Sequence, residues 1–71
     1  MLTNERLVYL RKSHGLMQND VANYLNLSRV AYCHYETGRR RPPSDVLVRL
    51  SRFYNVSVDE ILGTSFAKKK R

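Results

Sequence analysis

The chain has 71 residues, which leaves room for one small domain, since domains usually contain about 100–200 residues. Its composition, 42% hydrophobic and 27% charged, is that of a folded protein, and its longest apolar run is four residues, far from the roughly 20 that a membrane-spanning helix needs. The 13 Lys and Arg residues outnumber the 6 Asp and Glu residues, and the net charge of +7 indicates a polyanionic partner, either a nucleic acid or an anionic membrane surface.

The hydrophobic spacing predicts an all-α protein of five short helices, because no alternating apolar pattern indicates a strand. We expect the first helix to begin with Thr3 as its N-cap and to end at His14-Gly15, where glycine suits the C-terminal turn. Leu7 and Leu10 are three residues apart and would share the buried face of this helix.

The second and third helices are expected over residues 18–25 and 29–37. Between them, Asn26 tolerates a positive φ, so that a three-residue turn with a buried Leu27 is expected. Ser28 is the expected N-cap of the third helix. A helix, a short turn and a second helix in this order predict a helix-turn-helix.

The fourth helix is expected to open at Ser44-Asp45 and to end at Asn55. The run Ser57-Val58-Asp59-Glu60 is a capping box that predicts the start of a short fifth helix. Ile61 and Leu62 would be buried on that helix, and Gly63 would end it.

The third helix is predicted to have an apolar side and a polar side. At about 100° per residue, Ala31, Tyr32 and Tyr35 fall together on the inner side. The outer side carries Arg29, Val30, Cys33, His34 and Thr37. This outer face has no acidic residue and is rich in hydrogen-bond donors, which suits the edges of bases in the major groove. Glu36 lies at the border between the two sides.

The positive charge is concentrated in two runs. Arg39, Arg40 and Arg41 directly follow the third helix, and Lys68 to Arg71 end the chain. Without the last four residues the balance is 9 basic against 6 acidic residues. We expect a domain over residues 1–63 and a basic tail over residues 64–71, which has no hydrophobic periodicity.

Residues 6 to 62 resemble the lambda-repressor-like helix-turn-helix family, also called XRE or Cro-CI type. The matching positions are Arg6-Leu7, Leu10-Arg11, Gly15-Leu16-x-Gln18, Val21-Ala22, Leu25, Leu27-Ser28-Arg29, Tyr35-Glu36-x-Gly38-Arg39, Pro42, Leu50 and Val56 to Leu62. This resemblance implies a compact five-helix domain that binds DNA through its third helix.

The resemblance also implies roles for individual residues. Those expected to face bases are Arg29, Val30 and His34, and those expected at the DNA backbone are Gln18, Ser28, Thr37, Arg39, Arg40 and Arg41. Arg11 and Glu36 match an internal ion pair that ties the first helix to the third. The chain departs from the family at Met17, where a serine or threonine N-cap is usual, and at Tyr32, where an isoleucine or valine is usual.

We therefore expect a cytoplasmic, sequence-specific regulator of transcription, in particular a repressor, that binds double-stranded DNA. One short recognition helix reads only a few base pairs, at about 1–3 kcal/mol each, which is little discrimination against a whole genome. A homodimer on a palindromic operator doubles the surface that reads bases. The residues expected at the dimer interface are Val58, Ile61, Leu62 and Phe66.

Other functions stay open at this point. The chain could be a small antitoxin, or another protein-interaction module, whose DNA binding is secondary. A membrane-surface peptide is disfavoured because none of the first four helices is strongly basic on one face, and an enzyme because no nucleophile has a paired base. We expect no cofactor, no small-molecule ligand and no metal. Cys33 is the single cysteine of the chain. It could be a redox sensor or simply a half-buried residue.

Overall fold

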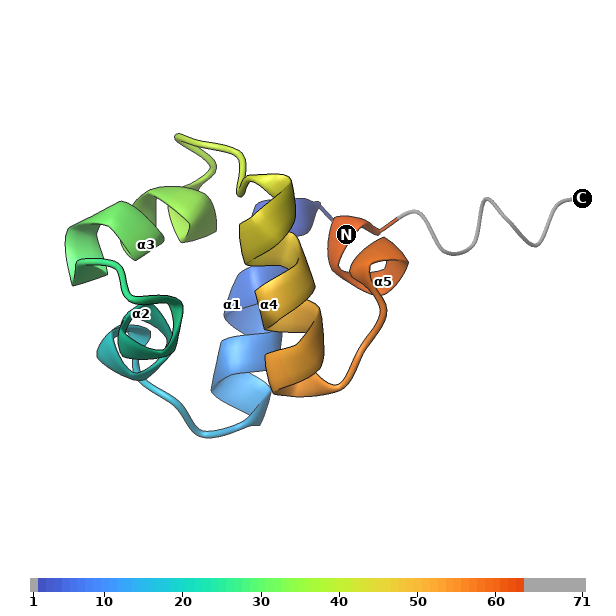
Figure 1. Cartoon of the computed structure of the whole chain (residues 1–71), viewed down its shortest axis with the longest axis horizontal. Helices are drawn as coiled ribbons and strands as arrows, with labels where there is room; N and C mark the ends of the chain where they lie inside the picture. The colour runs from blue at the N-terminus through green and yellow to red at the C-terminus, as the bar shows by residue number, and fades with distance from the viewer. Residues whose placement is uncertain (1, 64–71) are drawn as a thin grey trace, which may run out of the picture.

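Five α-helices make up residues 2–63, the part of the chain that the computed structural model describes (Figure 1). They are α1 (Thr3–Ser13), α2 (Gln18–Leu25), α3 (Arg29–Thr37), α4 (Ser44–Tyr54) and α5 (Val58–Leu62). No strand occurs between residues 2 and 63, which confirms the all-α fold expected from the sequence. None of these helices is long and apolar enough to cross a membrane.

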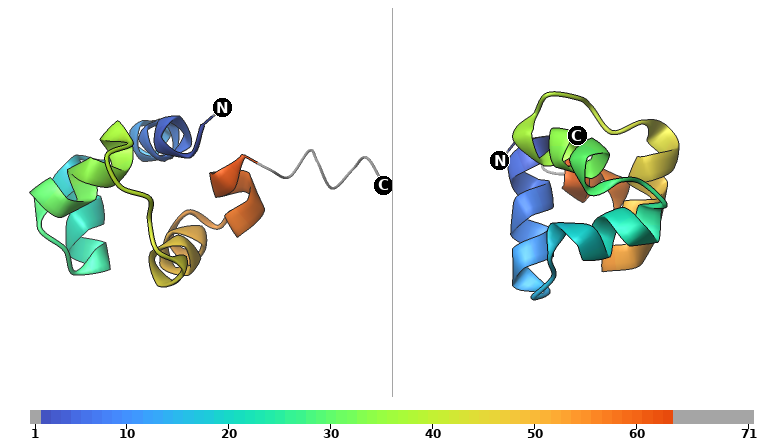
Figure 2. Two further views of the ribbon diagram at one scale, coloured as in Figure 1. Left: turned by 90° about the horizontal axis from the view of Figure 1, so that it is seen from above. Right: turned by 90° about the vertical axis from the view of Figure 1, so that its left-hand side faces the viewer.

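The helices surround one core. Seen from above, α1 and α4 lie on opposite sides of it, the α2–α3 pair closes one end and α5 closes the other (Figure 2, left). Helix α3 packs on both α1 and α2, whereas α5 packs on α1 and α4. This arrangement leaves one side of the α2–α3 pair turned outward at the end of the molecule (Figure 1).

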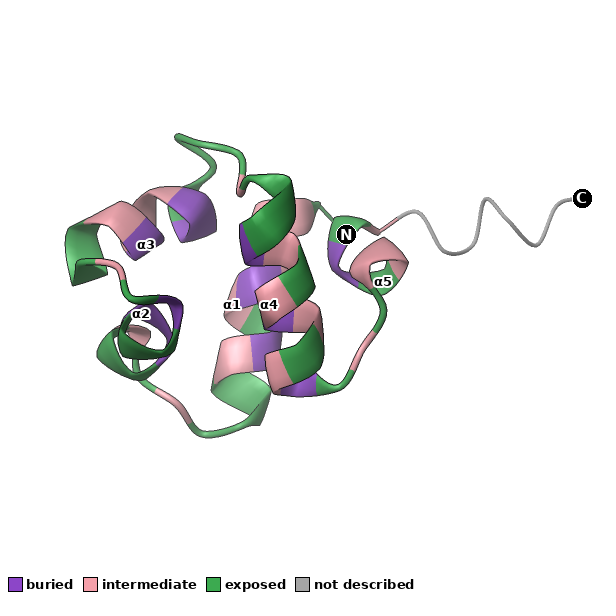
Figure 3. Ribbon diagram, viewed as in Figure 1, coloured by how far each residue is buried: buried purple, intermediate pink, exposed green. Residues whose placement is uncertain are grey.

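Every helix contributes buried residues to the core (Figure 3). One side chain on each helix is 0% exposed. These five residues are Leu7, Val21, Tyr32, Leu50 and Ile61. Tyr32 stands where the family that the sequence resembles usually has isoleucine or valine. Its ring fills the interior, and its hydroxyl donates a hydrogen bond of 2.6 Å to Glu36.

Two expectations about burial are wrong. Leu62 is 37% exposed, because on a five-residue helix Ile61 occupies the inner position and its neighbour is rotated away from the core. Leu27 is half-buried and packs against the edge of the core, where a buried residue was expected.

The predicted caps of α3 and α5 are present. The Ser28 hydroxyl accepts a hydrogen bond of 3.1 Å from the N–H of Ala31. In the capping box of α5, the Ser57 hydroxyl accepts from the N–H of Glu60 at 3.0 Å, and the Glu60 carboxylate accepts from the N–H of Ser57 at 3.2 Å. Asn26 and Asn55, with φ values of 62° and 58°, end α2 and α4 in the left-handed conformation.

The starts of α1 and α2 depend on acidic residues in the first turn. Thr3 is the first helical residue and not the N-cap; the cap position belongs to Leu2, whose N–H donates to the Glu5 carboxylate at 3.1 Å. The N–H of Met17 similarly donates to Asp20 at 2.7 Å. At the start of each of these two helices, a carboxylate in the third helical position therefore takes the place of a serine or threonine cap.

Candidate nucleic-acid interface

The turn between α2 and α3 holds the two helices in a fixed relation. It spans residues 26–28, and the N–H of Leu27 donates to the carbonyl of Ala22 at 2.9 Å, which closes the end of α2. Ala22 is only 1% exposed, as a small residue should be where two helices meet closely. The right-hand view of Figure 2 shows α2 and α3 packed together at this end of the molecule, with α2 lying across it.

The outer face of α3 carries the residues expected to face bases. Arg29 and Val30, in the first turn of the helix, are exposed, and 56% of Val30 is accessible to solvent. His34 is half-buried one turn further along. The first turn of α3 therefore presents a cationic and an apolar side chain together, an arrangement that can contact a guanine and a thymine methyl group.

The basic loop, defined as Arg39 to Arg41, continues from the C-terminal end of α3. Gly38 has a φ of 83° and turns the chain away from the helix, and the N–H of Arg40 then donates to the carbonyl of His34 at 3.2 Å. All three arginines of the loop are exposed. Their guanidinium groups are suited to bind phosphate oxygens.

Thr37 and Ser28 lie at the two ends of α3. Thr37 is exposed, and its hydroxyl donates to the carbonyl of His34 at 3.4 Å. The Ser28 hydroxyl accepts the capping hydrogen bond from Ala31, so its own proton remains for a second partner. Both hydroxyls stand at positions from which a helix can contact a nucleic-acid backbone.

The internal ion pair between Arg11 and Glu36 is present. The Arg11 Nε donates to the Glu36 carboxylate at 2.6 Å, and the two side chains are only 12% and 4% exposed. A second nitrogen of Arg11 donates to the other carboxylate oxygen at 3.1 Å, which makes the contact bidentate. Glu36 is thus buried, whereas the sequence placed it at the border of the apolar face.

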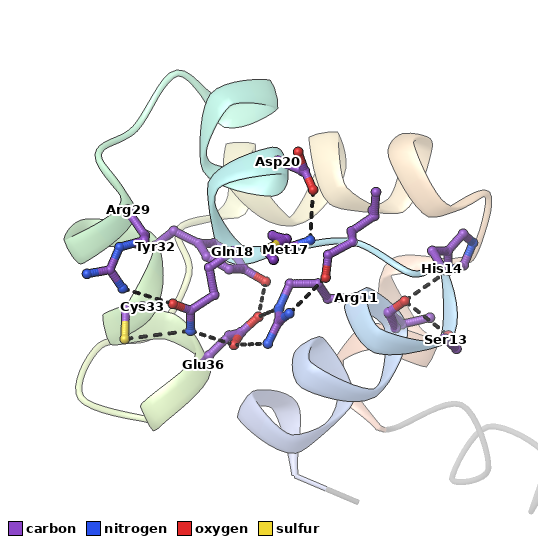
Figure 4. Close-up of polar contacts among 12 residues, drawn as sticks. Arg11, Ser13, His14, Met17, Gln18, Asp20, Arg29, Tyr32, Cys33 and Glu36 are labelled. Carbon is purple, nitrogen blue, oxygen red and sulfur yellow. Dashed lines mark hydrogen bonds and ion pairs between the residues drawn. The ribbon is translucent and has the colours of Figure 1, made fainter.

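Two further donors reach the same carboxylate, and Figure 4 shows them converging on it. They are the Tyr32 hydroxyl at 2.6 Å and the Gln18 amide nitrogen at 3.1 Å. Each oxygen of Glu36 therefore accepts two hydrogen bonds. Tyr32 was expected only as a core residue; its spacing of four residues from Glu36 on one helix was the signal for this contact.

These contacts fix the charge states. Burial opposes ionisation of Glu36, but hydrogen bonds from Arg11, Tyr32 and Gln18 outweigh it and hold the pKa of the carboxyl below its usual value. The hydrogen bond to Glu36 raises the pKa of Arg11. Burial, followed by the hydrogen bond to Glu36, raises the pKa of the Tyr32 hydroxyl, which stays a neutral donor. The pair is therefore ionised at neutral pH.

Gln18 joins this buried pair to the outer face of α3. Its amide oxygen accepts from Arg29 Nη1 at 3.1 Å, and its amide nitrogen lies 3.1 Å from Glu36 and 3.8 Å from the sulfur of Cys33 (Figure 4). Gln18 and Arg29 also line a shallow surface hollow with Met17 and Asn19. We call the six connected residues, Arg11, Gln18, Arg29, Tyr32, Cys33 and Glu36, the Glu36 network.

Only some of the residues expected at a dimer interface have side chains that a second copy could reach. Ile61 is fully buried in the core of its own chain, so its side chain cannot contact a second copy, and this expectation is wrong. Leu62 is exposed and Val58 half-buried, both on α5. Phe66 and the basic tail lie outside the described residues. Within residues 2–63, no group of three His, Cys, Asp or Glu side chains is placed to hold a metal ion.

Comparisons with known proteins agree with this geometry. The helix-turn-helix family model matches residues 7–61. The chain is 44% identical over 59 residues to the uncharacterized HTH-type transcriptional regulator YobD of Bacillus subtilis (strain 168), a match that covers 83% of this chain and 53% of that protein. It is 37% identical over 70 residues to the HTH-type transcriptional regulator ImmR of the same organism, which covers 99% of this chain and 55% of ImmR.

A solved structure shows the same fold. The P22 c2 repressor protein, crystallised in complex with synthetic operator 9T, matches this chain with a TM-score of 0.82 and 26% sequence identity. The match covers 90% of this chain and 97% of that chain. The chain belongs to the helix-turn-helix family, and these relatives are transcriptional regulators rather than enzymes. This confirms the family expected from the sequence. The chain spans about half the length of the curated relatives that it matches.

Proposed function

We propose that this chain is a sequence-specific DNA-binding regulator of transcription, in particular a repressor acting in the cytoplasm, and that α3 enters the major groove. The observation that carries the proposal is the outer face of α3, which has no acidic residue and leads directly into the exposed basic loop. The similarity to a repressor solved in complex with an operator supports it.

In this proposal the bases are read by Arg29, Val30 and His34. Arginine donates two hydrogen bonds to a guanine in the major groove, and valine packs on a thymine methyl group. The DNA backbone is bound by Ser28, Thr37 and the basic loop. Gln18, which was also expected at the backbone, could give its side-chain amide to a phosphate only by releasing Glu36 and Cys33.

The base contact of Arg29 is tested by selecting bound sequences from a random duplex library at stated salt. The unsubstituted chain should select a guanine at a defined position, and Arg29→Ala should lose that preference, which corresponds to about 1–3 kcal/mol. Arg52→Ala is the matched control, because Arg52 is an exposed arginine at the end of α4. If Arg29→Ala selects the unchanged consensus, α3 does not read bases through this residue.

We also propose that the chain binds a palindromic operator as a homodimer, with Leu62 and Val58 in the contact. Leu62 is an exposed apolar residue on α5, and this helix lies at the end of the molecule away from α3 (Figure 1). A pair of recognition helices is expected to span half-sites whose centres lie about 34 Å apart.

Sedimentation and footprinting test the dimer. Leu62→Glu should shift the chain toward monomer and weaken binding to the full operator, because it buries a charge in the interface. Val48→Glu is the control, since Val48 is similarly exposed on α4. A monomer that binds one unrepeated site at full affinity would rule out the dimer.

A further inference from the structure

We propose that a groove beside the basic loop is a docking site for an acidic and apolar peptide segment of a partner protein, and that its occupant competes with DNA for Arg40 and Arg41. The competition rests on the proposed function, in which these two arginines bind phosphates. The groove has a volume of about 570 Å³, and its lining comes from the start of α1, from α3, the basic loop and α4, and from the end of α5. Figure 1 shows the loop running from α3 to the start of α4.

Apolar side chains form much of the lining of this groove. Tyr35 is buried, and Leu47 is half-buried and packs against the core, so these two residues make a floor. Leu2 and Leu62 also line the groove, but 66% and 37% of their surfaces are exposed to water. Large apolar side chains that are exposed singly need no explanation, whereas their gathering around one groove is typical of a surface that binds a protein.

The charge of the groove selects the chemistry of its occupant. Arg40 and Arg41 are exposed and line it, and none of the described residues that line it is acidic. A guanidinium group binds a carboxylate through two parallel hydrogen bonds. A DNA backbone alone would satisfy the arginines but leave the exposed leucines in water. The groove as a whole therefore matches a peptide that carries Asp or Glu side chains next to apolar ones.

The partner segment comes from another protein, because the end of this chain has the wrong charge. Residues 64–71 contain four basic residues and no acidic one, so the two arginines of the groove repel them. A partner bound in the groove takes Arg40 and Arg41 away from phosphates, since one guanidinium cannot serve both. The slope of log K against log salt concentration should then fall by about 1.8, and binding to every DNA sequence should weaken. The partner thus releases the chain from DNA.

The test measures the fluorescence anisotropy of a labelled short peptide in which leucine and glutamate alternate. The same peptide with glutamine in place of glutamate should bind at least about tenfold more weakly, and added salt should weaken only the acidic peptide. Leu2→Asn should weaken the acidic peptide by about five- to tenfold, because an apolar contact is lost. This substitution keeps the start of α1, where the N–H of Leu2 donates to Glu5. Val48→Asn is the control, since Val48 is exposed but does not line the groove.

Competition is measured with a labelled duplex and the unlabelled acidic peptide. At about ten times its own Kd, the peptide should raise the apparent Kd for DNA about tenfold, for cognate and unrelated duplexes alike. Leu2→Asn should bind DNA as the unsubstituted chain does, and the same concentration of peptide should displace less of it. This variant separates the two ligands, because Leu2 lines the groove but lies outside the residues proposed to contact DNA.

Several results would overturn the proposal. They are equal binding of the acidic and the glutamine peptide, no binding of the acidic peptide up to about 1 mM, and undiminished binding of that peptide by Leu2→Asn, which would place it on another basic surface. Sedimentation supplies one more, since a dimer that Leu2→Asn converts to monomer would make a second copy the occupant. If the chain binds no duplex, the proposed function and the competition fail together, while the anisotropy of the peptide still decides whether the groove is a docking site.

Discussion

Replacing Glu36 with glutamine is expected to lower the free energy of unfolding by about 3–5 kcal/mol. The substitution removes the charge that faces Arg11 at 2.6 Å and leaves a guanidinium that is only 12% exposed without its counter-charge. A domain of this size usually has only about 3–5 kcal/mol of stability from its core. The midpoint of urea unfolding, followed by circular dichroism, should therefore fall close to zero denaturant.

Two further variants separate the lost charge from other effects of the substitution. Glu60→Gln should change the stability by less than about 0.5 kcal/mol, because Glu60 is exposed and glutamine can replace it in the capping box. Combining Arg11→Met with Glu36→Gln should recover stability relative to Glu36→Gln alone, because no unpaired charge remains in the interior. Thermal melting of Glu36→Gln within about 2 °C of the unsubstituted chain would show that the pair contributes little.

The helix ends were predictable where one residue decides them. Ser28 and Ser57 cap the helices that they were expected to cap, Asn26 takes the positive φ expected of it, and Asn55 ends α4 as expected. These signals act within a single turn, so they can be read from a few neighbouring residues. The start of α1 was predicted one residue late, at Thr3, because there the capping group is a carboxylate inside the helix.

The Glu36 network was only partly predictable. The resemblance to a known family supplied the pair of Arg11 and Glu36, which are 25 residues apart in the chain. The contact between Gln18 and Arg29 joins the starts of two helices, and it depends on the angle at which α2 and α3 cross. No periodicity in the sequence reports that angle. Ile61 illustrates the same limit, since five residues of helix are too few to show which side is buried.

Replacing Arg39, Arg40 or Arg41 with alanine is expected to weaken binding to all DNA sequences about equally. Each phosphate contact that is lost should reduce the slope of log K against log salt concentration by about 0.9, and loss of all three should reduce it by about 2.7. The reason is that a bound guanidinium releases counterions from the duplex without reading a base. The hydrogen bond that anchors the loop, from Arg40 to His34, uses backbone atoms and survives the substitution.

Lysine substitutions distinguish charge from geometry at the same positions. Arg39→Lys, Arg40→Lys and Arg41→Lys should keep the salt slope, because each retains a positive charge, and should lose some affinity where the contact is bidentate. Arg40 and Arg41 also line a groove beside Leu2, Thr3 and Asn4 at the start of α1. An unchanged slope for Arg40→Ala and Arg41→Ala would show that these two side chains make no phosphate contact. A change in sequence preference at constant slope would instead place the substituted arginine against a base.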